Sequence, residues 1–232
     1  MYLPEIKVNF VKRLVILHTV PEWNFYSKYF SFPFKGRFLD INLRFDNEGR
    51  LLAGPLFSAP KMALILEIAL KRGLRETLAI GWAGKNPGSN LNLGDLFIPV
   101  RSISLEGTSK FYFFNRQVFY LDDYVLKYIE ESLSQYEISF KIGTILSADI
   151  PWRVENFPNL TEKLEDLNFE AIDMETSAFY CLSEYYGFKG LSLHFITDEY
   201  GKISHRRPEE TLKSLRKSLL PLIANFLEKG FS

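Results

Sequence analysis

Short apolar runs alternate with helical patterns along this chain. Residues 13–19, 77–82 and 191–197 are rich in large apolar side chains over a length typical of strands buried on both faces. Between the first two runs, residues 60–70 carry apolar side chains at the spacing of one helix face. This alternation predicts an α/β fold, a three-layer sandwich in which helices cover a central mixed, largely parallel sheet.

Three segments have less regular patterns. Residues 24–35 are crowded with aromatic side chains, and we expect them to be irregular, because Pro21 ends the first apolar run. Residues 160–167 predict a weak helix. From Pro208 onward, leucines recur at helical spacing, which predicts one long C-terminal helix.

The composition is that of an ordinary globular protein. The chain has 232 residues, of which 47% are apolar and 24% charged, and it contains no repeat or low-complexity linker. We therefore expect one domain spanning residues 1–232. Lysine and arginine together number 28, as do aspartate and glutamate, so the formal net charge is zero. This balance argues against nucleic acid or an anionic membrane as partner and favours a small molecule.

The sequence carries no sign of export or membrane insertion. Residues 1–11 include Glu5 and Lys7 and lack a long apolar stretch, so we expect no signal peptide. The apolar runs elsewhere are interrupted every few residues, unlike a membrane-spanning helix. The expected location is the cytoplasm.

Cysteine and histidine are too sparse and too scattered for a metal site. Cys181 is the single cysteine, which excludes an intrachain disulfide. It lies on an apolar helical stripe, which indicates a buried thiol. His18, His194 and His205 lack the spacing of metal ligands, so no metal is expected. His18 follows the first apolar run and is either a ligand contact or a core side chain.

The segment Asp173-Met174-Glu175-Thr176-Ser177-Ala178 places two acids in an otherwise apolar run. A helix is expected from Met174, and Glu175 falls on its inward face. An inward carboxylate is costly unless a polar group meets it, and a polyol with hydroxyls to donate is a suitable partner. Asp173 has two equally good interpretations, a ligand contact or a helix N-terminal acid stabilised by the helix dipole.

Further polar residues follow the ends of the other predicted strands. In open α/β sheets, ligands bind beyond the carboxyl ends of the strands, where all such residues meet. The residues at this edge are His18, Thr19, Glu22, Ser58, residues 81–84, residues 149–153 and Asp198. Considered alone, Asp198 has a simpler role as a turn cap at a strand end.

Three segments resemble the nucleoside phosphorylase/hydrolase superfamily, which contains purine nucleoside and uridine phosphorylases and methylthioadenosine-type nucleosidases. Residues 54–60, with Ile80-Gly81-Trp82-Ala83-Gly84 and Leu93-Gly94-Asp95, are similar to its phosphate-side block. Ser147-Ala148-Asp149-Ile150-Pro151-Trp152-Arg153 resembles its base-side loop. The acid motif with downstream Ile196-Thr197-Asp198 resembles its sugar-binding and catalytic elements.

The resemblance implies a role for each matching residue. Glu175 would accept hydrogen bonds from sugar hydroxyls, Met174 would pack under the sugar, and Asp198 would protonate the leaving base. The remaining substrate contacts it implies are Asp173 beside the sugar, Trp152 and Arg153 at the base, and Ser58, Trp82 and Gly84 in the phosphate-side block.

Two departures concern the group that accepts the sugar. Phosphorylases of the family carry a Gly-Asp-x-Gly-Arg type loop after the first strand, where this chain has residues 18–22. Their usual arginine before the Gly-x-x-Gly element is Ala79 here. Phosphate needs several charge-assisted donors, which Arg37 or Arg44 of a neighbouring subunit could supply. Alternatively, Glu22 activates water, as in the nucleosidases, or is simply a solvated loop acid.

The expected function is cleavage of the N-glycosidic bond of a nucleoside, with a purine nucleoside as substrate and phosphate as acceptor. The alternatives are hydrolysis by water and a non-catalytic nucleoside-binding relative. No cofactor beyond inorganic phosphate is implied. The resemblance also implies a homo-oligomer, a dimer or hexamer, and the aromatic segment 23–34 fits either such an interface or core packing.

Overall fold

The computed structural model describes residues 10–151, 167–199 and 208–232. The described strands belong to one sheet, in the order β10-β6-β8-β9-β5-β1-β4-β3-β2, with β7 paired to β6. The strands are β1 (Arg13–Leu17), β2 (Phe34–Phe38), β3 (Ile41–Phe45), β4 (Arg50–Gly54), β5 (Glu76–Lys85), β6 (Leu96–Ser104), β7 (Val118–Tyr120), β8 (Lys141–Ser147), β9 (Ala171–Asp173) and β10 (Lys189–Glu199).

The sheet closes on itself in its central part. Strand β10 pairs with β6 at one end of the order and also with β5, so β5, β10, β6, β8 and β9 form a barrel-like ring. Parallel pairings join β1 to β4 and β5, β5 to β10, and β8 to β6 and β9. The other pairings are antiparallel.

The α/β class and the mixed sheet are confirmed, whereas the largely parallel character and the three-layer sandwich are not. Hydrophobic patterns indicate which segments are strands but not in which direction neighbouring strands run. Strand β9 has three residues, too few for a pattern, and it supplies an antiparallel pairing within the ring.

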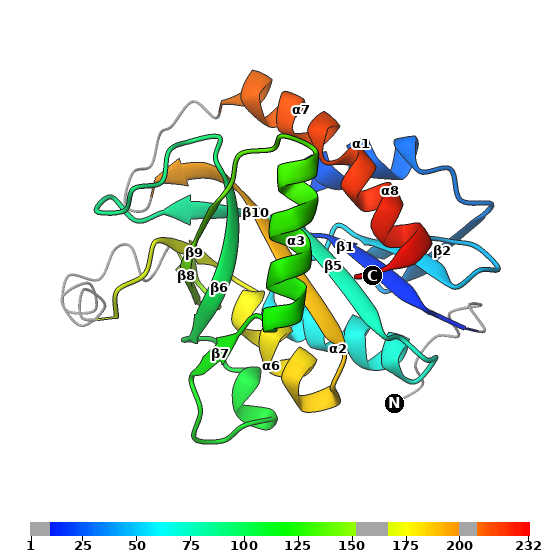
Figure 1. The fold of residues 1–232 in the computed structure, drawn as a ribbon. Coiled ribbons are helices and arrows are strands. Elements are labelled where there is room, and N and C mark those ends of the chain that lie inside the picture. Colours follow the sequence, from blue (N-terminus) through cyan, green and yellow to red (C-terminus); the bar gives the residue numbers. More distant parts are fainter. Residues whose placement is uncertain (1–9, 152–166, 200–207) are drawn as a thin grey trace.

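Two groups of helices cover the sheet (Figure 1). Helices α2 and α6 pack against each other, and α6 also contacts β6, β8 and β10. Helices α1 and α8 form the second group. Both contact β1, and α7 precedes α8 and packs against it. The described helices are α1 (Val20–Tyr29), α2 (Ala59–Leu70), the 3-10 turn η1 (Ser109–Phe111), α3 (Asp123–Gln135), α6 (Thr176–Tyr186), α7 (Glu209–Ser218) and α8 (Leu220–Lys229).

Two expectations about helices are wrong, and proline explains both. Residues 24–29 of the segment expected to be irregular belong to α1, because Pro21 lies in the first turn, where its missing N–H is not needed. The C-terminal helix is divided at Leu219, because Pro221 has no N–H to donate to the carbonyl four residues earlier. The helix expected over residues 160–167 lies largely outside the described residues.

The first apolar run is β1, and all five of its side chains are buried. Arg13 at its start is buried too, and its guanidinium meets Glu76 at 3.3 Å and the carbonyl oxygens of Leu227 and Glu228. A buried cation with these acceptors keeps its hydrogen bonds, so the strand tolerates it. Strand β10 is likewise buried from Gly190 to Thr197.

Candidate active site

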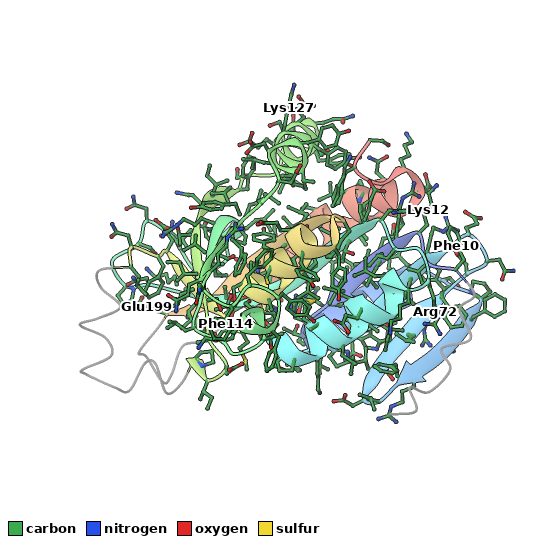
Figure 2. The ribbon with its side chains drawn as sticks, turned by 90° about the horizontal axis from the view of Figure 1, so that it is seen from below. Phe10, Lys12, Arg72, Phe114, Lys127 and Glu199 are labelled. Carbon is green, nitrogen blue, oxygen red and sulfur yellow. The ribbon has the colours of Figure 1, made fainter. Side chains whose placement is uncertain are left out.

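Polar residues gather at one edge of the sheet. Strands β1, β4, β5 and β10 are parallel to one another, so their carboxyl ends lie at the same edge. His18 follows β1, Ser58 follows β4, and Asp198 lies near the end of β10. In Figure 2, Glu199, the last residue of β10, lies at the opposite end of the molecule from Phe10, Lys12 and Arg72. This edge is where the sequence places its candidate site.

The acid motif and Asp198 are connected through β5. Gly84 is the register partner of Ile172 on β9 and of Asp198 on β10. Neighbouring strands lie about 4.8 Å apart, so the Cα atoms of Ile172 and Asp198 are roughly 10 Å apart. A Cβ atom on Gly84 would lie 2.6 Å from Oδ1 of Asp198, so only glycine leaves this carboxylate its place. The acid motif, which begins at Asp173, therefore lies across a single strand, β5, from Asp198.

Glu175 is buried, with 5% of its surface exposed, at the N-terminus of α6. The backbone N–H of Ser58 donates a 2.6 Å hydrogen bond to Oε1, and that of Met174 donates a 3.3 Å bond to Oε2. Burial, reinforced by the nearby charge of Asp173, raises the pKa of Glu175 to about 8. A carboxylate that is partly desolvated and not fully hydrogen-bonded is ready to accept donors from a ligand.

Ser58 has an unusual backbone conformation that serves this contact. Its φ is +84° and its ψ is 146°, a region that residues with a Cβ rarely adopt. The conformation directs its N–H towards Glu175 immediately before α2 begins at Ala59. Strain of this kind persists where surrounding contacts over-determine the backbone, and it is concentrated at functional sites.

Asp173 finds its hydrogen-bond donors within the protein. Oδ2 accepts from the backbone N–H and the hydroxyl of Thr176, at 2.9 and 2.6 Å, and Oδ1 accepts from the hydroxyl of Ser147. Burial raises the pKa of Asp173, and these hydrogen bonds oppose the rise. The contact with the Thr176 N–H satisfies one of the unpaired donors at the start of α6. Asp173 thus anchors the segment that carries Glu175.

A buried network behind Asp173 includes Glu106, which the sequence analysis missed. Ser147 Oγ accepts from the backbone N–H of Ser177, and Ser177 Oγ donates to Oε1 of Glu106 at 3.0 Å. Glu106 has no exposed surface and also accepts bonds from Ser104 and Ser109. An acid two residues after a buried strand, followed by Gly, Thr and Ser, is the signal that the sequence offers.

His18 lies beside Glu175 and is almost completely buried. Its Nδ1 is 3.1 Å from the carbonyl oxygen of Leu56 and 3.7 Å from Oε2 of Glu175. Its ring faces that of His194, with 6.3 Å between centroids, and a Cβ on Gly81 would lie 2.8 Å from its Cδ2. Burial, and then repulsion from His194, lowers the pKa of His18 to about 4, so the ring is neutral at pH 7.

A match to a protein-family model shows the family of this chain. The model described as the phosphorylase superfamily matches residues 43–228, which is more than half of the chain. The chain belongs to this superfamily. Purine nucleoside phosphorylase DeoD-type 2 of Vibrio parahaemolyticus is 25% identical over 151 residues, covering 64% of this chain and 62% of that protein. The chain therefore spans less than two thirds of the length of the curated relative it matches.

A solved structure shares the fold of this superfamily member. The crystal structure of AMP nucleosidase from Bacteroides thetaiotaomicron aligns with a TM-score of 0.72 and 18% identity, covering 94% of this chain and 90% of that one. At this identity the likeness concerns the fold. The family model thus confirms the superfamily that the three motifs predict. The curated relative is named as a phosphorylase, and the protein that shares the fold is named as a nucleosidase.

Glu22 of this superfamily member lies against α7. It has no exposed surface, and its Oε1 accepts a 2.8 Å hydrogen bond from Nε of Arg216. Glu22 Oε2, Arg216 Nη2 and Thr19 Oγ1 are buried and have no partner among the described residues. The hydrogen-bond partner that the described part of the chain offers Glu22 is therefore Arg216, and not His18, Ser58 or Glu175.

The other predicted site residues have different surroundings. Asp198 is half-buried, and its Oδ2 accepts from the hydroxyl of Thr197 at 3.1 Å. Met174 and Trp82 are also half-buried, and Trp82 is the register partner of Phe195. Trp152, Arg153 and His205 lie outside the described residues.

The three positions weighed for a phosphate site differ in burial and in surroundings. Ala79 is buried within β5, and Arg37 on β2 is exposed. The guanidinium of Arg44 lies 5.9 Å from the ring centroid of Trp23. None of these positions offers a buried cation beside Glu175 within a single subunit.

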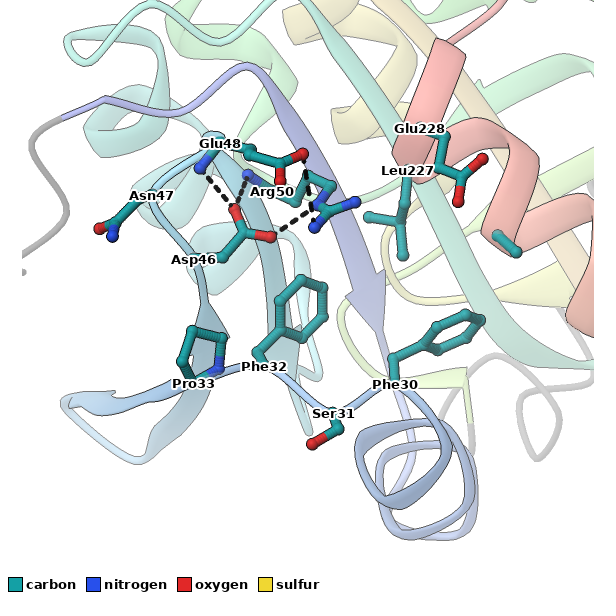
Figure 3. Close-up of a pocket in the computed structure, with 11 residues that line it drawn as sticks. Phe30, Ser31, Phe32, Pro33, Asp46, Asn47, Glu48, Arg50, Leu227 and Glu228 are labelled. Atoms are coloured by element: carbon teal, nitrogen blue, oxygen red, sulfur yellow. Dashed lines mark hydrogen bonds and ion pairs between the residues drawn. The ribbon is translucent and has the colours of Figure 1, made fainter.

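A separate cavity of about 370 Å³ lies near the amino end of β4 (Figure 3). Asp46 Oδ2 there accepts a 2.6 Å hydrogen bond from Nε of Arg50, and Glu48 also pairs with Arg50. Phe30 and Phe32 contribute an apolar wall. Asp46 and Glu48 thus bind Arg50 within this cavity, and the acids of the candidate active site lie at the opposite end of β4.

Within residues 10–151, 167–199 and 208–232, no three His, Cys, Asp or Glu side chains are grouped so that they could hold a metal ion. In the same ranges no helix is both long enough and apolar enough to cross a membrane.

Proposed function

We propose that this protein cleaves the N-glycosidic bond of a purine nucleoside. The observation that carries the proposal is a buried carboxylate, Glu175, held by the Ser58 N–H at the same sheet edge as Asp198. One acid is suited to bind a sugar and the other to act on the base attached to it. Membership of the phosphorylase superfamily supports the same reaction class.

Glu175 recognises the sugar through its hydroxyls. The carboxylate has one short bond, from Ser58, and one long bond, from Met174, so its remaining lone pairs are available to hydroxyl donors. Hydroxyls that donate to the charged form favour ionisation and lower the raised pKa of Glu175. Bond cleavage develops positive charge on the sugar, and an ionised carboxylate nearby stabilises that charge. Met174 packs under the ring, while Asp173 anchors the segment.

Asp198 acts on the leaving base. As the bond to C1′ breaks, the electron pair moves to the base, and a proton delivered to a ring nitrogen neutralises it. A positioned general acid contributes roughly two to four orders of magnitude to such a step. Gly84 leaves room for this carboxylate. Trp152 and Arg153 would bind the base, and Trp82 would line the site beside them.

The acceptor is phosphate or water, and the positions of the cations favour water. Within the described part of the chain, the arginines with buried side chains are Arg13 and Arg216, and each already binds a carboxylate. A phosphate dianion needs several charge-assisted donors. Phosphorolysis would therefore need cations from outside the described part of this subunit, such as Arg37 or Arg44 of a neighbouring subunit, whereas hydrolysis would not.

A homo-oligomer, dimer or hexamer, is part of the proposal. Trp23 and Tyr26 of the aromatic segment are buried in this single chain, so core packing accounts for them. Phe111 is 90% exposed and Phe114 is 86% exposed. Large exposed aromatic side chains of this kind are typical of interaction surfaces.

A panel of nucleosides tests the function. Each nucleoside is incubated with the protein, with and without inorganic phosphate, and free base is separated by chromatography. Base release that requires phosphate identifies a phosphorylase, and release without phosphate identifies a nucleosidase. Binding without release, unaffected by Asp198→Asn, indicates a non-catalytic relative and contradicts the proposed catalysis.

A further inference from the structure

We infer that His18 is a positioning residue for sugar recognition, which it performs by offering its Nδ1–H to the carboxylate of Glu175. The inference rests on the proposed function and extends it to a residue in none of the three matching motifs. His18 follows β1, Glu175 begins α6, and Ser58 precedes α2. The fold thus brings three separate segments together around one carboxylate.

The ring orientation of His18 determines which nitrogen faces Glu175. Nδ1 lies 3.1 Å from the carbonyl oxygen of Leu56, which can only accept, so Nδ1 carries the proton in a neutral ring. The same nitrogen is 3.7 Å from Oε2 of Glu175. The proton on Nδ1 therefore lies between two acceptors, the Leu56 carbonyl and the carboxylate.

The carboxylate needs a donor on this side. Oε1 of Glu175 has the 2.6 Å bond from Ser58, but Oε2 has only the 3.3 Å contact from Met174. When Glu175 ionises to bind hydroxyls, Oε2 becomes the less satisfied oxygen in a buried environment. A small rotation of the His18 ring shortens the 3.7 Å approach to a hydrogen bond and holds the carboxylate plane for the sugar.

The neighbours of the His18 ring keep it neutral and leave its Nδ1 edge towards Glu175. The ionisable groups that face His18 are Glu175, Asp173 and His194, and His194 lowers its pKa further after burial has done so. Gly81 provides the space that the ring occupies against β5, because a Cβ there would collide with Cδ2. Nε2 is buried without a partner among the described residues, so the ring gains its polar contacts through the Nδ1 edge.

Two amide variants test which nitrogen of the His18 ring is needed, Nδ1 or Nε2. The side-chain amide of asparagine matches the position of Nδ1, and that of glutamine matches Nε2, so His18→Asn keeps the proposed donor and His18→Gln moves it. His18→Leu removes it. The readout is the ratio of kcat/KM for a ribonucleoside to that for its 2′,3′-dideoxy analogue, with calorimetric binding of both nucleosides as a second measurement.

We expect His18→Asn to stay within about threefold of the wild-type ratio. His18→Gln and His18→Leu should reduce the ratio by about 10- to 100-fold, the effect of one hydrogen bond to a charged group. The loss should concern the ribonucleoside, whereas the dideoxy analogue should change little. Thermal unfolding of each variant identifies any that fail to fold, and the Asn and Gln pair, which differ by one methylene, then carries the comparison.

The outcomes distinguish the inference from the proposed function. Equal ratios of ribonucleoside to dideoxynucleoside kcat/KM in wild type and His18→Leu would overturn the inference about His18 but not the proposed function. The same holds if His18→Gln keeps the wild-type ratio and His18→Asn loses it. If the wild type binds nucleosides without releasing base, catalysis fails and the same comparison is made on the dissociation constants. If the wild type neither binds nor cleaves any nucleoside, the proposed function fails and the inference fails with it.

Discussion

The backbone N–H of Ser58 and the carboxylate of Glu175 form a 2.6 Å hydrogen bond between residues 117 positions apart. The bond joins the segment that precedes α2 to the start of α6, two helices that pack against each other. It determines where the inward acid of the motif is held. It coincides with the positive φ of Ser58, the conformation in which the Ser58 N–H meets the carboxylate.

Replacing Asp198 by Asn should reduce turnover of a purine nucleoside by about 10²- to 10⁴-fold, because the amide cannot deliver a proton to the base. Substrate affinity should change much less, since the amide keeps the size of the side chain. Steady-state kinetics measure both effects. A turnover number equal to that of the wild type would remove Asp198 from the reaction.

Glu175 should make the stability of the wild type depend on pH. Its pKa in the folded protein, about 8, lies above the ordinary value of 4.5, so the folded state binds this proton more tightly than the unfolded chain. The resulting stabilisation is complete below about pH 4.5 and is lost as pH rises through 8. Between pH 6.5 and 8.5, the wild type should therefore lose about 1 to 2 kcal/mol relative to Glu175→Gln.

Urea unfolding of wild type and Glu175→Gln at several pH values measures this difference. His18 and His194, whose pKa values are lowered to about 4, are present in both proteins, so their contributions largely cancel. Parallel stability curves across this range would mean that Glu175 is not protonated more readily in the folded state.

Replacing Ser58 by Gly should stabilise the fold. The φ of +84° is costly for serine and freely accessible to glycine, and strain of this kind amounts to about 1–3 kcal/mol. Greater flexibility of the unfolded glycine chain offsets up to about 1 kcal/mol of the gain. Because the donor to Glu175 is a backbone N–H, sugar binding should persist. A lower melting temperature for Ser58→Gly would contradict this account of the strain.

Variants of the buried pair Glu22 and Arg216 test whether Glu22 has a structural or a catalytic role. Glu22→Leu alone leaves Arg216 buried without its carboxylate and should cost about 3–5 kcal/mol of folding free energy. The double variant Glu22→Leu/Arg216→Met should recover most of this loss. Chemical unfolding measures the stability, and base release from the folded double variant shows whether Glu22 also activates water. Equal destabilisation in the single and double variants would contradict the structural role.

Local patterns were sufficient for the elements with strong periodicity. Strand β1, helix α2 and strand β10 were predicted because burial on one or two faces leaves a regular record in the sequence. Helix α1 leaves no such record, because its aromatic residues face both inward and outward and because Pro21 is compatible both with a strand end and with a helix start. Strand β9 was too short to leave a pattern.

The sequence by itself determined the α/β class, the family, and the edge of the sheet at which the polar residues meet, because each depends on local periodicity or on short motifs. Only the tertiary structure decided the closed ring of strands, the contact of Glu22 with Arg216, and the meeting of His18 and Ser58 at Glu175. Strand direction and side-chain pairing are set by contacts between segments far apart in the chain, and no local pattern records them.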